Sequence, residues 1–295
     1  MRFVTFSMSD GVRRLGVLDP QKEEIVCLEG EEFGADLTEF IGRGFAGIVA
    51  VRGALSRRAQ TVALAGVALH APIPRPARNI FCVGKNYFEH SKEFEKSGFD
   101  SSSGGVTVPD APVVFTKAPS TVIGTGVPIP AHLDPSESTD YEGELGVIIG
   151  EGGRGIAKAA AYDHVFGYTL INDVTARKLQ NHHKQWFLGK SVDGFCPMGP
   201  CVVTADEVGD VTTLTLTTDV NGERRQEAKV ADLIFDIPTI IETISRTMTL
   251  EPGDVIATGT PVGVGIGFNP PKFLKSGDVV RISIEGIGVL ENPVA

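Results

Sequence analysis

The sequence predicts a β-rich α+β protein, and three observations support this class. The 295 residues include 35 glycines and 18 prolines, which favour short strands joined by tight turns over a helical bundle. Short apolar or alternating runs recur along the chain, whereas only two helical patterns stand out in its larger part. The hydrophobic content of 42% and the charged content of 22% are ordinary for a soluble globular protein.

Residues 1–73 are predicted to form a small N-terminal α/β domain. Two strands around a turn at Asp10-Gly11 and two short helices are expected, at residues 3–6, 14–18, 36–41 and 47–55. Residues 74–78 follow as a Pro-rich linker, because closely spaced prolines exclude a helix there. The remaining residues, 79–295, are predicted to form the catalytic domain.

The catalytic domain is expected to consist mainly of strands. The predicted strands lie at residues 80–83, 113–116, 145–149, 165–171, 214–220, 255–258 and 279–284. One helix is predicted from Asp173 through Gln180. A second is predicted over 237–248, because Ile240, Ile241, Ile244 and Met248 recur at helical spacing. The Gly-, Ser- and Asp-rich stretch 97–110 is predicted to be a mobile loop.

Charge and composition exclude several classes of partner. The net charge of −10 argues against a nucleic-acid-binding surface, which needs a basic face. No apolar run approaches the roughly 20 residues of a membrane-spanning helix, and the first residues lack the apolar core of a signal peptide. The four cysteines are scattered without a Cys-x-x-Cys motif, as in reduced proteins. We therefore expect a cytoplasmic protein that binds a small molecule.

Two carboxylates, Glu142 and Glu144, stand two residues apart where an apolar run begins. Side chains two apart on a strand point to the same face, so these carboxylates should converge. Like charges beside a core are unfavourable unless a cation lies between them. Asp173 ends another apolar run, and an all-oxygen set of this kind suits Mg²⁺ or Mn²⁺, with Ca²⁺ also possible. The alternative is a solvated strand face, which the buried character of residues 145–149 disfavours.

Three polar side chains are predicted to lie beside this metal site. Arg177 and Gln180 share a helical stripe with Asp173, and both offer donors to a carboxylate or an oxyanion. Lys190 lies in a Gly-flanked turn from which it could reach a substrate carbonyl. The alternatives are an exposed Asp-Arg pair and an ordinary surface lysine.

His90 and Glu93 form a second candidate pair. They are three residues apart after the predicted strand 80–83, so they can touch on one helical turn. A histidine oriented by a carboxylate is a common general base, although the spacing alone also fits a surface pair. His182 and His183 are expected to be solvated.

A Gly-rich loop follows the predicted strand 255–258. Its backbone N–H groups and the hydroxyls of Thr258 and Thr260 could hold a carboxylate. It is not a phosphate loop, because no Gly-Lys-Ser/Thr follows. Asp254 and Asp278 are interpreted as structural turn residues.

Together these motifs resemble the fumarylacetoacetate hydrolase family over nearly all of residues 79–292, including its acylpyruvate hydrolase and 2-hydroxyhepta-2,4-diene-1,7-dioate isomerase members. The segments that carry the resemblance are Val83–Tyr87 with His90 and Glu93, Tyr141–Leu145, Gly167–Thr169, Asn172–Arg177 with Gln180, Gly189–Ser191, Leu250–Asp254 and Thr258–Pro261. The fold that the resemblance implies is the family's mixed β-sheet roll, usually as a homodimer. Lys85 departs from the uncharged residue or Arg that relatives often carry, and the loop 97–110 is longer than in the smallest members.

The resemblance also implies a role for each candidate residue. It assigns Glu142, Glu144 and Asp173 as Mg²⁺ or Mn²⁺ ligands and places His90 and Glu93 on a lid as the water-activating dyad. Charge stabilisation is assigned to Arg177, Gln180 and Lys190. Substrate contacts are assigned to Tyr87, Gly259 and Thr260.

The reaction that the resemblance implies is hydrolysis of a carbon–carbon bond in a 1,3-diketo acid such as an acylpyruvate, through a metal-bound enolate. The same enolate chemistry would serve a decarboxylase of an oxaloacetate-like acid, an isomerase of a 2-hydroxy-dienoic diacid or a sugar-acid dehydratase. A protein that binds a metabolite without catalysis is the remaining alternative, and the complete set of acid, base and cation positions argues against it.

Overall fold

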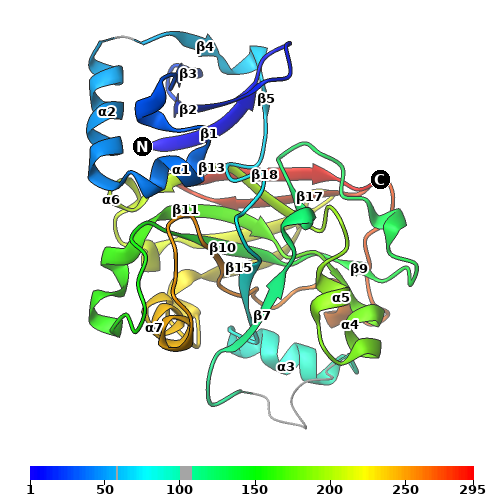
Figure 1. Ribbon diagram of the computed structural model, residues 1–295. Helices are drawn as coiled ribbons and strands as arrows, with labels where there is room; N and C mark the ends of the chain where they lie inside the picture. The colour runs from blue at the N-terminus through cyan, green and yellow to red at the C-terminus, as the bar shows by residue number, and fades with distance from the viewer. Residues whose placement is uncertain (58, 100–107) are drawn as a thin grey trace.

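The computed structural model describes residues 1–57, 59–99 and 108–295. Its centre is a twelve-stranded mixed sheet (Figure 1). The strand order is β4 (Thr61–Ala63), β3 (Glu24–Cys27), β2 (Arg13–Asp19), β1 (Arg2–Ser7), β13 (Cys196–Thr204), β11 (Val165–Asn172), β10 (Gly143–Ile149), β16 (Val255–Ala257), β6 (Ile80–Gly84) and β7 (Val113–Lys117). The remaining two strands pair at its side: β5 (Ala68–Leu69) with β1 and β8 (Val122–Ile123) with β13.

A second sheet of four antiparallel strands lies against the first. Its order is β15 (Glu223–Lys229), β14 (Thr215–Val220), β17 (Val279–Ile284) and β18 (Gly288–Pro293). Strand β18 lies against β13, and β14 lies against β10. Inward-facing residues of β14 alternate with partly exposed ones, as expected for a strand with one buried face. A short pair, β9 (Thr139–Asp140) with β12 (Thr175–Ala176), completes the strands.

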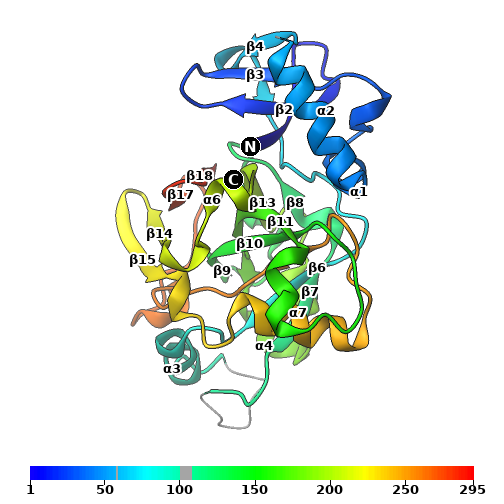
Figure 2. The ribbon, with the colours of Figure 1, turned by 90° about the vertical axis from the view of Figure 1, so that its left-hand side faces the viewer.

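The α-helices surround these sheets. They are α1 (Leu37–Gly42), α2 (Gly44–Ser56), α3 (Phe88–Lys96), α4 (Arg177–His183), α5 (Phe187–Lys190), α6 (Ala205–Val208) and α7 (Ile237–Thr247). Figure 2 shows α1 and α2 with β2, β3 and β4 at one end of the molecule and α3 at the opposite end. Helix α7 begins after Asp236, whose carboxylate accepts from Thr239 N, and it buries Ile240, Ile241 and Ile244. Among the described residues, no helix is both long enough and apolar enough to cross a membrane.

The β-rich α+β class is confirmed, and every predicted strand is present with small shifts of its ends. The strands that were not predicted are β3, β4, β5, β8, β9, β12, β13, β15 and β18. The predicted helix from Asp173 is wrong in its first residues, because β12 intervenes and α4 begins at Arg177. Met248 was expected on the apolar face of its helix, but it follows α7 in an extended conformation and is 38% exposed.

The segment 74–78 lies between β5 and β6 and contains neither helix nor strand. Strand β1 pairs with β13, with Arg2 opposite Val203 and Phe3 opposite Val202. Residues before the segment therefore share the main sheet with residues after it. The predicted loop 97–110 lies partly outside the described residues, because 100–107 are not described.

Candidate active site

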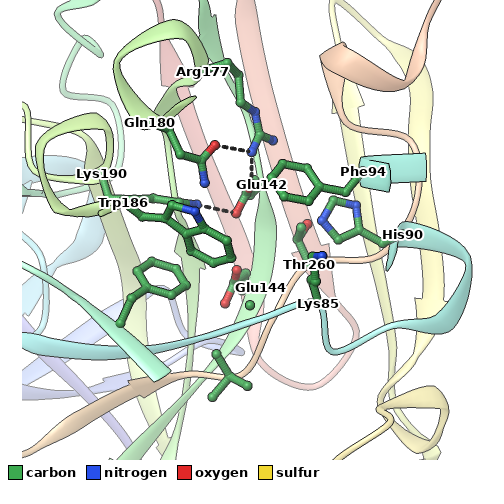
Figure 3. A pocket seen from close by; sticks show the side chains of 13 residues that line it. Lys85, His90, Phe94, Glu142, Glu144, Arg177, Gln180, Trp186, Lys190 and Thr260 are labelled. Carbon is green, nitrogen blue, oxygen red and sulfur yellow. Dashed lines mark hydrogen bonds and ion pairs between the residues drawn. The ribbon is translucent and has the colours of Figure 1, made fainter. Parts of the chain in front are cut away.

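A cavity opens between the centre of the main sheet and α3 (Figure 3). Seven of the predicted site residues line it: His90, Glu142, Glu144, Arg177, Gln180, Lys190 and Thr260. The other lining residues are Val83, Gly84, Lys85, Phe94, Phe115 and Trp186. Figure 3 shows Gln180, Lys190 and Trp186 on one side of the central carboxylates, with His90, Lys85 and Thr260 on the other.

The strand pairing of β10 with β11 brings the three carboxylates together. Glu144 lies in β10 and pairs with Ile171, and Asp173 follows the end of β11. The backbone N–H of Asp173 donates to Glu142 O at 2.8 Å, which fixes the two residues beside each other. Each of the three buried carboxylates offers an oxygen that lies within 4.8 Å of the others.

Gly143 is required between the two glutamates. It faces the second sheet, and a Cβ there would lie 2.1 Å from Thr218 Oγ1. Its N–H donates to Gln226 Oε1 at 3.0 Å. Gly143 therefore allows β10 to contact β14. It also sets the spacing of Glu142 and Glu144.

Two buried cations contact the carboxylates. Lys190 Nζ donates to Glu142 Oε2 and to Asp173 Oδ2, both at 2.7 Å. Arg177 Nη1 lies 2.6 Å from Glu142 Oε1, and its Nε donates to Asp140 Oδ2 at 2.9 Å. Arg177 and Gln180 lie in the first turn of α4, so they face the cavity although Asp173 is not part of that helix.

These contacts move the pKa values of the two glutamates in opposite directions. Burial alone would raise the pKa of Glu142, but Lys190 and Arg177 outweigh it and lower this pKa to about 2. Burial raises the pKa of Glu144 well above its ordinary value, and the negative charges of Asp173 and Glu142 raise it further. The backbone N–H of Gly259 donates to Glu144 Oε2 at 2.7 Å. This hydrogen bond lowers the pKa of Glu144, but it only partly offsets the increase.

Lys117 is a further buried cation beside the site, and it was not among the predicted site residues. Its Nζ lies 2.8 Å from Asp173 Oδ1 and donates to Val174 O at 2.9 Å and to Lys190 O at 2.5 Å. The side chain is 0% exposed. The sequence contains only weak evidence for the burial of Lys117. It is the last residue of the strand Val113–Lys117, a position where charged residues are usually solvated.

The predicted dyad is present on α3. His90 Nδ1 lies 3.1 Å from Glu93 Oε2, and both side chains are largely buried. The imidazole lines the cavity, whereas Glu93 lies behind it and also accepts from the backbone N–H of Gly263. A carboxylate acceptor at Nδ1 fixes the tautomer that leaves Nε2 free for proton transfer.

The other predicted residues differ in how close they lie to the cavity. Thr260 lines it, and its hydroxyl accepts from Gln226 Nε2 at 2.8 Å. Gly259 is buried beside it, with its N–H directed to Glu144. Tyr87 is buried just before α3 and is not among the residues that line the cavity. The hydroxyl of Thr258, predicted to hold a substrate carboxylate, donates to Leu145 O instead.

Three further predictions concern residues outside the cavity. His182 and His183 are exposed on α4, as predicted. Asp254 accepts from Glu251 N and Asp278 accepts from Lys275 N, as expected of turn residues. Asp254 also pairs with Arg78, the last residue of the predicted linker.

The donor set fits a hard divalent cation. Glu142, Glu144 and Asp173 supply oxygen alone, at mutual distances that one ion can bridge. Burial, together with the negative charges of Asp173 and Glu142, raises the pKa of Glu144, so its ionised form is unfavourable without a further cation nearby. A divalent cation there would supply that positive charge.

The chain is similar to proteins of one family. Residues 79–295 match the family model "Fumarylacetoacetate (FAA) hydrolase C-terminal". The chain is 46% identical over 287 residues to oxaloacetate tautomerase YisK of Bacillus subtilis (strain 168), covering 94% of this chain and 92% of that protein.

Two solved structures extend the likeness to the whole fold. Fumarylacetoacetate hydrolase from Exiguobacterium antarcticum is 44% identical, with a TM-score of 0.84 and coverage of 100% of this chain and 99% of that one. Maleylpyruvate hydrolase from Sphingobium sp. SYK-6, in complex with a manganese(II) ion and pyruvate, is 32% identical, with a TM-score of 0.78 and the same coverage. The carboxylate cluster, the matched family model and these relatives lead to one conclusion: the chain is a member of the fumarylacetoacetate hydrolase family, a family of enzymes.

Proposed function

We propose that this enzyme interconverts the keto and enol forms of a small 2-oxo dicarboxylic acid of the oxaloacetate type, with a divalent cation held by Glu142, Glu144 and Asp173. The observation that carries this proposal is the placement of His90 and the carboxylate cluster around one small cavity. The 46% identity to an oxaloacetate tautomerase over nearly the whole chain supports the choice of substrate.

Each residue has a separate task in the proposed reaction. Glu142, Glu144 and Asp173 would hold the cation, Mg²⁺ or Mn²⁺, which would supply Lewis acidity toward a 2-oxo acid. His90 Nε2 removes a proton from C3, and the C–H electron pair forms the C2–C3 double bond. The C2 oxygen then takes the proton that His90 carries, which gives the enol and leaves the imidazole neutral. Glu93 holds Nδ1 throughout, so that Nε2 keeps its position.

The cations of the cavity are placed to stabilise the oxyanion. Two N–H groups of Lys190 Nζ donate to Glu142 and Asp173. The third N–H group is left to donate to a developing negative charge. Burial would lower the pKa of Lys190, but Asp173 and Glu142 outweigh this and raise it, so the ammonium form persists at neutral pH. Lys190 therefore acts as a fixed positive charge rather than as a base.

Part of the cavity wall is apolar. Phe94, Phe115 and Trp186 line the cavity together with Val83. Apolar groups lower the local dielectric constant, which strengthens the interaction of Lys190 with the oxyanion.

Hydrolysis of an acylpyruvate is the second candidate function. The contact of His90 with Glu93 favours it, because a histidine oriented by a carboxylate can also deprotonate water. The likeness to a maleylpyruvate hydrolase supports the same reading. In that reaction water would attack the distal carbonyl, and the enolate of pyruvate would leave.

One set of assays separates these functions. Oxaloacetate and acetylpyruvate are followed by ultraviolet absorbance and by a pyruvate assay, with Mg²⁺ or Mn²⁺ and with EDTA. Metal-dependent acceleration of keto–enol exchange in oxaloacetate without pyruvate release supports the tautomerase. Pyruvate from acetylpyruvate supports the hydrolase, and pyruvate from oxaloacetate supports a decarboxylase.

Two variants serve as controls for these assays. Glu142→Ala should abolish the metal-dependent rate, because it removes one proposed ligand. His90→Gln should lower the rate while metal binding persists. Turnover that survives both substitutions would refute the assignment of this cavity as the site.

A further inference from the structure

Trp186 is the single tryptophan of the chain, and it lines the cavity while only 7% of its surface is exposed. Its indole Nε1–H is buried and has no hydrogen-bond partner within the part of the chain that the structure describes. A buried donor without an acceptor is unfavourable, and a polar group in this state is usually satisfied by something that the protein binds.

The indole is held in place by its neighbours. Phe115 meets it edge to face at 5.0 Å between ring centroids, and Phe94 of α3 does so at 6.0 Å. A Cβ on Gly84 would lie 2.4 Å from Trp186 Cζ3, so the indole occupies the space that a side chain at residue 84 would need. The orientation of the N–H is therefore fixed before any ligand binds.

A backbone hydrogen bond also links Trp186 to Lys190, which belongs to the charged part of the site. Lys190 N donates to Trp186 O at 3.0 Å, so the two residues are one helical turn apart. Figure 3 shows the indole on the same side of the cavity as Lys190 and Gln180. A second buried donor in this cavity, Arg177 Nη2, also has no partner among the described residues.

The chemistry of these donors identifies the group that they would bind. An indole N–H and a guanidinium N–H can only donate, so both need an acceptor oxygen. The carboxylates of the protein that face the cavity are committed to Lys190, Arg177 or the proposed cation. A bound substrate can supply the acceptor, and a carboxylate is the strongest acceptor that a 2-oxo acid offers.

We propose that Trp186 is a substrate-binding residue whose Nε1–H donates to a carboxylate oxygen of the bound 2-oxo acid, with Arg177 Nη2 as a second donor. The inference rests on the proposed function for its substrate class. It goes beyond that function because it assigns substrate binding to a neutral donor on the wall of the cavity. This donor is neither a metal ligand nor part of the dyad of His90 and Glu93.

The single tryptophan allows this proposal to be tested without turnover. Intrinsic fluorescence of the wild-type protein, saturated with Mg²⁺, is titrated with oxalate and with pyruvate. A saturable change in emission is expected, because a ligand that accepts from Nε1–H alters the surroundings of the only indole. The absence of any change, while calorimetry detects binding of the same ligand, would overturn the proposal.

The variant Trp186→Phe removes the N–H and keeps an aromatic ring between Phe94 and Phe115. We expect the Kd of oxalate, measured by calorimetry with Mg²⁺ present, to increase about ten- to a hundredfold, as for the loss of a hydrogen bond to a charged group. The KM for oxaloacetate should rise by a similar factor with little change in kcat. An unchanged Kd would show that the indole has only a packing role and would overturn the proposal.

Two controls keep the outcomes distinct. Phe187→Leu changes the neighbouring side chain, which is 42% exposed and lies outside the cavity, and should leave the Kd unchanged. The affinity of Trp186→Phe for Mn²⁺ should equal that of the wild type, since the metal ligands are intact. If the wild type turns over no 2-oxo acid, the proposed function fails, and the oxalate titrations still decide the role of Trp186.

Discussion

The backbone N–H of Gly263 donates to the carboxylate of Glu93, with distances of 3.0 and 3.2 Å to its two oxygens. Glu93 is thus held from two sides, by the imidazole of His90 and by the loop that follows β16. Tyr141 Oη donates to Gly263 O at 2.7 Å and anchors this loop in turn. The position of α3 over the cavity therefore depends on one backbone segment far from it in sequence.

A small substitution in that segment should disable the dyad without unfolding the protein. A Cβ on Gly267 would lie 1.8 Å from Glu93 Oε1, and the carboxylate can move away because it ends a flexible side chain. For Gly267→Ala we expect kcat to fall about a hundredfold, the lower range of a lost general base, while the melting temperature stays close to that of the wild type.

Gly66→Ala is the matched control, because a Cβ at residue 66 meets no atom within 4 Å. It should leave kcat unchanged. Wild-type kcat in Gly267→Ala would show that contact between Glu93 and His90 is dispensable.

The raised pKa of Glu144 gives the metal-free protein a distinctive pH dependence. Because the folded state holds this proton more tightly than the unfolded state does, the stability it contributes is complete below the ordinary pKa of 4.5. It is lost as the pH rises toward the raised pKa. Relative to the wild type, Glu144→Gln should therefore gain stability with pH in this window, by at most about 1.4 kcal/mol per pH unit.

Urea unfolding in EDTA, measured from pH 5 upward, tests this sign. The same variant should lose the rise in melting temperature that Mn²⁺ gives the wild type, because one ligand is weakened. A pH-independent difference between the two proteins would contradict the assignment of the shift to Glu144.

The buried Lys117 should matter for stability far more than an exposed lysine. Lys117→Met removes the cation beside Asp173 Oδ1 and leaves two backbone carbonyls without this donor. Breaking a buried ion pair in this way destabilises a protein by about 3–5 kcal/mol. The comparison is Lys22→Met, which removes an exposed ion pair with Asp19 and should have little effect. Equal midpoints of urea unfolding for the two variants would refute this expectation.

A substitution opposite Trp186 should displace the indole. In Gly84→Ala the new methyl group would overlap the six-membered ring, so we expect the emission of the single tryptophan to shift to longer wavelength as the ring moves toward solvent. The KM for the 2-oxo acid should increase in the same variant. Gly42→Ala, where a Cβ meets nothing within 4 Å, should change neither quantity.

The sequence predicted the carboxylate cluster because strand periodicity is strictly local. Predicting that Glu142 and Glu144 converge required only the alternation of side chains along one strand. Predicting that Asp173 joins them required only the end of the next strand. The helix assigned from Asp173 was wrong because Thr175–Ala176 pairs with Thr139–Asp140, a tertiary contact that no local pattern encodes. Arg177 and Gln180 still face the cavity, since the helix that carries them begins at Arg177.

The residues that were missed depend on packing between distant segments. Strand β13 contains Pro197, Gly199 and Pro200, which resemble a turn, yet it is the strand that joins β1 to β11. Lys117 is buried only because Asp173 and the backbone of Lys190 surround its ammonium. Trp186 lies in the cavity wall only because residue 84, in a different part of the chain, is glycine.

The strand order of the main sheet has a consequence for how the protein forms during synthesis. Strand β1 can pair early with β2, but its pairing with β13 must wait until β13 has emerged, which at ribosomal speed takes roughly 10 to 40 s. Strand β6 likewise can pair early with β7, whereas its parallel partner β16 is among the last strands made. Pairing between distant strands is slow to nucleate and leaves apolar edges exposed meanwhile. The yield on expression should therefore respond more to translation rate and temperature than that of a protein built from local hairpins.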